Sequence, residues 1–136
     1  MATTGHEGTI IREPFPTIAP DRLALEFSDH EGAVTTVYPK GDVDVFTADD
    51  IEKLAAERIA SGQRSFVFNL TETEYFDGSF FAVLVRVLKK VREFGGNVCL
   101  VVDEEQKSAR RILSITGLDT VFKPHSDLET ALQHLS

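Results

Sequence analysis

The sequence has little of the chemistry on which many enzymes and secreted proteins depend. Its 136 residues include one cysteine and no tryptophan. Cys99 therefore has no partner for an intrachain disulfide, and its position in the apolar stretch NVCLVV is typical of a small buried side chain. The phosphate-binding patterns G-x-x-x-x-G-K-S/T and G-x-G-x-x-G are absent, and the four histidines lack metal-ligand spacing. We expect a protein that is not an enzyme and uses no metal or other cofactor.

Basic residues and long apolar runs are scarce as well. Lys and Arg number 14 against 22 Asp and Glu, so the formal net charge is −8. Such a surface repels nucleic-acid phosphates and anionic lipids, and favours a partner with a basic face. No apolar run approaches the ~20 residues that a membrane-spanning helix needs, and the first residues do not resemble a secretory leader. We expect a cytoplasmic protein that binds neither nucleic acid nor membrane.

The chain does contain enough apolar residues for one core. Hydrophobic residues make up 42% of a chain whose length suits one domain. Residues 1–19 hold Pro14 and Pro16 without any sustained period, which predicts an extended or mobile lead-in outside the core. We therefore expect a single domain over residues 20–136.

Alternating and helical periodicities predict the order ββαβαβαβα. An antiparallel hairpin is expected at residues 22–27 and 33–41, with its turn between them. Further strands are predicted at residues 65–70, 97–103 and 120–123, a loop at 71–76, and helices after Thr47, after Asp77, at 107–117 and at 126–135. Capping boxes are predicted at Thr47 with Asp50 and at Ser126 with Glu129. The fold class is α/β, with a mostly parallel central sheet and about four helices.

A small-residue junction, Asp77-Gly78-Ser79, directly precedes the apolar run of the second helix. The Asp77 carboxylate is placed to accept a hydrogen bond from a first-turn N–H group. An accessible hydroxyl at such a position could also carry a phosphate, because free N–H groups lie close to it. The residues alone favour a plain helix start and leave a regulatory hydroxyl as the alternative.

Four motifs in order resemble the STAS-domain family of anti-sigma-factor antagonists, bacterial regulators of stress and sporulation sigma factors. The resemblance covers about Leu23 to Leu135. It is carried by KGDVDVFTADDIEKL, by FVFNLTETEYFDGSFFAVLVRVLKKVREFGGNVCLV, by ARRILSITGLDTVF and by DLETAL. Each motif is loose, but four in sequence at the right spacings are specific.

The resemblance implies a regulatory switch. Family members bind an anti-sigma factor, often a serine kinase with a GHKL-type ATP site, and so free a sigma factor; phosphorylation ends the binding. The modified residue follows the aspartate of a D-S-S/T-G motif, and that position is Gly78 here. Ser79 matches the second position, and Phe80 replaces the motif's glycine. The switch is therefore absent or displaced to Ser79, which is the phosphorylation candidate.

The resemblance also implies a partner-binding face made of the loop after the hairpin and the start of the second helix. The candidate residues are Gly41, Asp42, Val43, Asp44, Asp77, Gly78, Ser79 and Phe80. Phe80 is expected to present an exposed or half-buried ring there. Two other functions stay open: a structural STAS component of a larger signalling complex, with self-association as one form of it, and a small-ligand-sensing STAS module.

Overall fold

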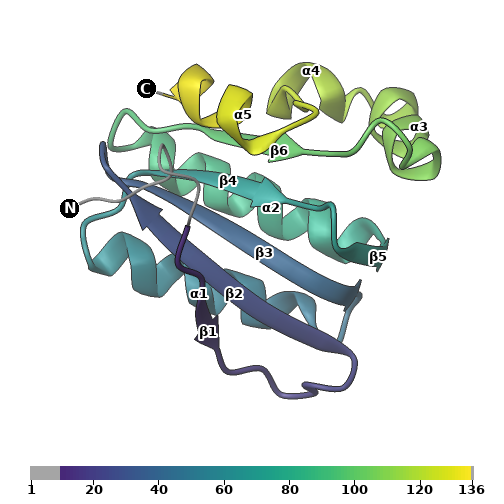
Figure 1. Ribbon diagram of the computed structural model, residues 1–136, viewed down its shortest axis with the longest axis horizontal. Coiled ribbons are helices and arrows are strands. Elements are labelled where there is room, and N and C mark those ends of the chain that lie inside the picture. Colours follow the sequence, from purple (N-terminus) through teal and green to yellow (C-terminus); the bar gives the residue numbers. More distant parts are fainter. Residues whose placement is uncertain (1–9, 136) are drawn as a thin grey trace.

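One sheet of six strands, with five helices packed around it, makes up the described part of the chain (Figure 1). The computed structural model describes residues 10–135. The strands are β1 (Glu13–Phe15), β2 (Leu23–His30), β3 (Val34–Val43), β4 (Ser65–Asn69), β5 (Thr73–Phe76) and β6 (Val98–Val101). The helices are α1 (Ala48–Ala60), α2 (Gly78–Arg92), α3 (Lys107–Thr116), α4 (Leu118–Phe122) and α5 (Leu128–Leu135).

The sheet has the order β1-β2-β3-β4-β6, and β5 also pairs with β3. β1, β2 and β3 are antiparallel neighbours, whereas β4 and β5 are parallel to β3, and β6 is parallel to β4. The predicted α/β class, with its leading hairpin and largely parallel sheet, is confirmed. Because β3, β4, β5 and β6 run in one direction, their carboxyl ends meet at one side of the sheet, here called the carboxyl edge.

Helices cover both faces of the central strands. Phe66 and Phe68 of β4 belong to the main core with α1 and α2, while Val67 between them packs in a second cluster with α5. This alternation follows from the two-residue period of a strand. Burying each of these phenylalanines contributes about 1.5–3 kcal/mol, so the centre of the sheet contributes substantially to the stability of the fold.

Over residues 10–19 the N-terminal lead-in is held against the sheet. β1 pairs with β2, the Ser28 hydroxyl donates to the carbonyl of Ile11 at 2.6 Å, and the Thr17 hydroxyl donates to the carbonyl of Leu23 at 2.7 Å. The prolines do not prevent this because β1 is an edge strand, where a missing N–H donor is tolerated. Residues 1–9 of the expected lead-in lie outside the described residues.

Two short segments take a different structure from the one predicted. The expected loop at residues 71–76 contains β5, which continues along β3 beyond β4; the Thr73 hydroxyl donates to the carbonyl of Pro39 at 2.8 Å. Of the expected strand at residues 120–123, residues 120–122 belong instead to α4, and Lys123 follows its end. The left-handed backbone of Gly117 ends α3 and α4 starts at once, which turns Phe122 fully into the core.

Both predicted capping boxes are wrong, although the helices they were meant to start do form. The Thr47 hydroxyl donates to the carbonyl of Asp42 at 2.8 Å and caps no N–H of α1. At α5 the N–H of Thr130 is bound by Asp127, one residue later than the predicted Ser126. At α5 a carboxylate takes the place of the predicted serine, and charged acceptors make the stronger hydrogen bonds. At α1 the first N–H groups are bound by backbone carbonyls, Ala48 by Asp44 and Asp50 by Thr47.

None of the helices among residues 10–135 is both long enough and apolar enough to cross a membrane.

Candidate partner-binding surface

Strand pairing brings the two predicted site segments together. Asp42 of β3 is paired with Tyr75 of β5, and Val43 is paired with Phe76. Both strands end there, so Asp44 and Asp77, the next residue of each segment, leave the sheet side by side at the carboxyl edge. The loop between β3 and α1 and the first turn of α2 therefore form one surface.

The first turn of α2 is held by its own aspartate. The Asp77 carboxylate accepts a hydrogen bond from the N–H of Ser79 at 2.9 Å, as the sequence predicts. Gly78 is exposed, and a Cβ atom added to it would meet no described atom within 4 Å. Ser79 is half-buried, and its hydroxyl forms no hydrogen bond with the described residues. The turn thus has room for a side chain at position 78 and one unengaged hydroxyl at position 79.

Phe80 corrects the sequence-based expectation. Its side chain is 0% exposed, and its ring centre lies 6.1 Å from that of Phe68 and 5.7 Å from that of Phe76. The third position of α2 faces the sheet, so the ring fills core space and cannot contact a partner. Val43 is also fully buried. These two of the eight candidate residues support the surface from beneath.

The loop between β3 and α1 is organised by Asp44. One carboxylate oxygen accepts hydrogen bonds from the N–H groups of Phe46 at 2.9 Å and Thr47 at 3.2 Å, and the other pairs with Arg22. Partial desolvation raises the pKa of Asp44, but the Phe46 N–H and the Arg22 guanidinium outweigh it and hold this pKa below its usual value. Asp44 is therefore an ionised structural anchor of the loop.

Gly41 allows the N-terminal segment to approach β3. Its φ is +118°, and a Cβ atom there would lie 2.2 Å from the carbonyl oxygen of Arg22. The same carbonyl accepts a hydrogen bond from the N–H of Asp42 at 2.9 Å. Only glycine permits this contact, so Gly41 and Asp42 bind the chain just before β2 through their backbone.

Three exposed apolar residues at this surface are missing from the predicted set. Val45 is 67% exposed, Phe46 is 72% exposed and Tyr75 is 52% exposed. Val45 and Phe46 are neighbours in the chain, and adjacent exposed apolar side chains are typical of interaction sites on proteins. The available signal was a pair of large apolar residues in the loop DVDVFT, outside the period of the helix that follows. Tyr75 gave no such signal because its segment was predicted to be a loop.

Comparison with known proteins decides the family. The profile of the STAS domain matches residues 25–131. The chain belongs to the STAS domain family. It is 28% identical over 114 residues to the anti-sigma-F factor antagonist RsfB of Mycobacterium tuberculosis strain H37Rv, an alignment that covers 84% of this chain and 90% of that protein.

Solved structures of anti-sigma factor antagonists share the STAS fold. The crystal structure of one from Mycobacterium paratuberculosis has a TM-score of 0.72 and 26% identity, and the match covers 86% of this chain and 97% of that one. The unphosphorylated form of the antagonist SpoIIAA has a TM-score of 0.63 over 82% of this chain and 96% of its own; at 12% identity this is a similarity of fold alone.

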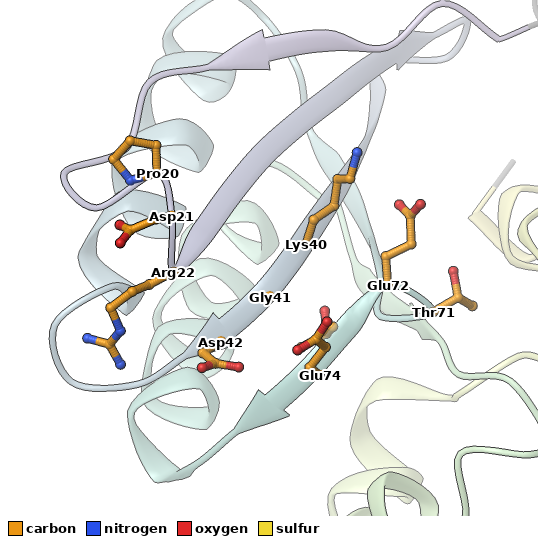
Figure 2. A pocket seen from close by; sticks show the side chains of 10 residues that line it. Pro20, Asp21, Arg22, Lys40, Gly41, Asp42, Thr71, Glu72 and Glu74 are labelled. Carbon is orange, nitrogen blue, oxygen red and sulfur yellow. The ribbon is translucent and has the colours of Figure 1, made fainter.

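A hollow of about 620 Å³ lies beside the surface of this STAS domain (Figure 2). It is bordered by the chain before β2, by β3 and by the start of β5. Its charged lining residues are Asp21, Arg22, Lys40, Asp42, Glu72 and Glu74. Acidic groups outnumber basic ones, which suits a basic partner. Among residues 10–135, no group of three His, Cys, Asp or Glu side chains is arranged to hold a metal ion.

Proposed function

We propose that this protein is a non-enzymatic regulator that binds an anti-sigma factor at its carboxyl edge and thereby frees a sigma factor. The pairing of β3 with β5 carries the proposal, because it joins the loop after Asp44 to the turn after Asp77. Val45 and Phe46 give that surface an exposed apolar centre. Related STAS proteins named as anti-sigma factor antagonists match it over most of their length.

Phosphorylation cannot release the partner through position 78, because Gly78 has no hydroxyl. Ser79 carries the only hydroxyl among residues 77–80. A phosphate there would add about −1.5 to −2 charges beside the Asp77 carboxylate, which already accepts from the Ser79 N–H. We therefore propose a constitutive antagonist, with Ser79 as the residue that a GHKL-type serine kinase would modify if the switch is displaced.

A structural role in a larger signalling complex is the second candidate, favoured by exposed apolar residues on α3. Ile112 is 38% exposed and Ile115 is 69% exposed, and residues three apart lie on one face of a helix. These residues could bind a second protein or a second copy of the chain. Light scattering of the purified protein, repeated with Ile115→Ser, separates this role from that of a monomeric antagonist.

Complex formation with candidate anti-sigma factors tests the main proposal. The purified protein is titrated calorimetrically with each kinase-type anti-sigma factor of the same genome, then incubated with it and Mg-ATP for intact-mass measurement. We expect binding without a mass change. A mass increase of one phosphate that is lost in Ser79→Ala would establish the displaced switch, and absence of binding to every candidate would contradict the proposed function.

Two phenylalanine variants locate the contact surface. Phe46→Ser removes an exposed apolar side chain from the carboxyl edge and should weaken binding by at least about tenfold, the effect of a central apolar contact. Phe94→Ser removes a ring that is 49% exposed just beyond the opposite end of α2, and should leave the affinity unchanged. Equal affinities for the two variants would place the contact elsewhere.

A further inference from the structure

We propose that the N-terminal segment Thr17–Arg22 is part of the surface that binds the anti-sigma factor, with Ile18 as its apolar contact. This inference rests on the proposed function, because it extends the same binding surface. The segment precedes the STAS match, which begins at residue 25. It would therefore give this chain a contact that the matched domain does not contain.

Ile18 is held in place by its backbone while its side chain faces solvent. Its N–H donates to the Asp50 carboxylate at 3.0 Å, and the Thr17 hydroxyl beside it donates to the carbonyl of Leu23 at 2.7 Å. The Ile18 residue is nevertheless 78% exposed. An apolar side chain presented by an ordered backbone loses little conformational freedom when a partner covers it. The arrangement suits binding and adds nothing to the core.

Both ends of the segment make contacts near the loop between β3 and α1. Asp50, which holds Ile18, lies in the first turn of α1, four residues after Phe46. Arg22, at the other end of the segment, pairs with Asp44, and its guanidinium carbon lies 5.9 Å from the centre of the Phe46 ring. Asp50 and Arg22 thus connect the two ends of the segment to the start of α1 and to the loop that carries Phe46.

The Asp50 contact orders the backbone at Ile18 and leaves the Ile18 side chain free to bind a partner. Asp50 is 6% exposed, and its carboxylate binds the N–H of a residue whose own side chain remains in solvent. The outer side of β2 is already paired with β1, so this hydrogen bond is not needed to complete the sheet. We conclude that the hydrogen bond from Ile18 to Asp50 serves to position Ile18.

Charge indicates the chemistry of the partner. Asp21 lies within the segment, and Asp42 and Glu74 line the same hollow; none of the three forms an ion pair or side-chain hydrogen bond with the described residues. Figure 2 shows Pro20, Asp21 and Arg22 along the turn that enters β2, across the hollow from Glu72. The anti-sigma factor should offer an apolar depression for Ile18 and Phe46, bordered by Lys or Arg side chains.

A pair of isoleucine variants tests this assignment. Ile18→Ser is compared with Ile11→Ser, because Ile11 is 77% exposed and lies in the same N-terminal region, before β1. Both proteins are titrated calorimetrically with the anti-sigma factor that the wild type binds. Ile18→Ser should weaken binding about tenfold and Ile11→Ser by less than about twofold, with melting temperatures equal to that of the wild type because both side chains are exposed.

The outcomes separate this inference from the proposed function. Wild-type affinity of Ile18→Ser, together with weakened binding of Phe46→Ser, would overturn the role of the segment and leave the proposed function intact. Absence of wild-type binding to every anti-sigma factor would overturn both. Amide hydrogen exchange of the wild-type complex gives a second measurement: residues 17–22 should gain protection on binding, and unchanged exchange there would contradict the inference.

Discussion

The two helices that begin at the carboxyl edge are positioned in opposite ways. α2 is capped by the residue that precedes it, since Asp77 binds the N–H of Ser79. α1 begins in a network that reaches far along the chain, in which Asp44 pairs with Arg22 and Asp50 binds Ile18. One helix start is local, and the other is joined to the N-terminal segment.

This difference indicates where the surface tolerates change. The start of α2 depends on the cap at Asp77 and on the buried ring of Phe80. Neither contact involves the exposed Gly78, where an added Cβ atom would meet no described atom within 4 Å. The absence of a hydroxyl at position 78 therefore need not disturb the fold. A change at the start of α1 is transmitted to residues 17–22, because the contacts there connect separate parts of the chain.

Phe80 provides the strongest test of the local start of α2. Phe80→Gly restores the glycine of the family motif but removes a fully buried ring, so the free energy of unfolding should fall by about 3–5 kcal/mol. Urea unfolding followed by circular dichroism measures this loss. Phe81→Ala is the control, because Phe81 is only partly buried and should give a smaller loss. A larger loss of stability in Phe81→Ala would show that the fold depends more on Phe81 than on Phe80.

Asp50 tests the long-range start of α1. Asp50→Ala removes the carboxylate that binds Ile18 and should lower the free energy of unfolding by about 1–2 kcal/mol. Asp49→Ala, at the exposed neighbouring position of the same turn, should cost less. Faster amide exchange at Ile18 in Asp50→Ala alone would show that the segment has been released. Equal losses of stability in the two variants would show that the negative charge of the first turn matters, and not the hydrogen bond to Ile18.

Asp77 tests the cap itself. Asp77→Ala should destabilise the protein by about 1 kcal/mol, whereas Asp77→Asn should keep most of the stability, because asparagine caps nearly as well. Thermal unfolding of the three proteins measures the difference. If Asn proved as damaging as Ala, the negative charge beside the helix dipole would be the important property, and not the hydrogen bond.

Gly78 should give the smallest change in stability. Gly78→Ser places a side chain in open space, so we expect the free energy of unfolding to change by less than about 0.5 kcal/mol. In contrast, a Cβ atom at Gly96 would lie 1.6 Å from the carbonyl oxygen of Arg64, so Gly96→Ser should destabilise strongly. Incubation of Gly78→Ser with a kinase-type anti-sigma factor and ATP should add a phosphate that the wild type does not acquire at this position.

The main elements could be predicted from periodicity, and the short ones could not. α1, α2 and β4 carry enough apolar residues to specify their type. β1, β5 and α4 are as short as β4 but lack its continuous run of buried apolar residues, so pairing partners and packing decide their structure. β5 forms because the end of β3 is free to pair there, which the residues of β5 alone do not reveal.

The sequence predicted which segments form the candidate site, but not which of their side chains are exposed. The motifs indicated both segments, and the Asp77 cap followed from local chemistry. The burial of Phe80 could have been found, because Phe80, Leu84 and Val91 recur at helical spacing on the buried face of α2. Val45 and Phe46 lie between the positions that carry the motif, so the resemblance gave no reason to expect an apolar surface there.

The sequence by itself determined the α/β order, the resemblance to the STAS family and the absence of a hydroxyl at position 78, because each depends on residue type and local spacing. Only the tertiary structure decided which site residues face solvent and that Ile18 is bound by Asp50. These two residues are 32 positions apart, and their hydrogen bond exists because the sheet brings the N-terminal segment to the start of α1.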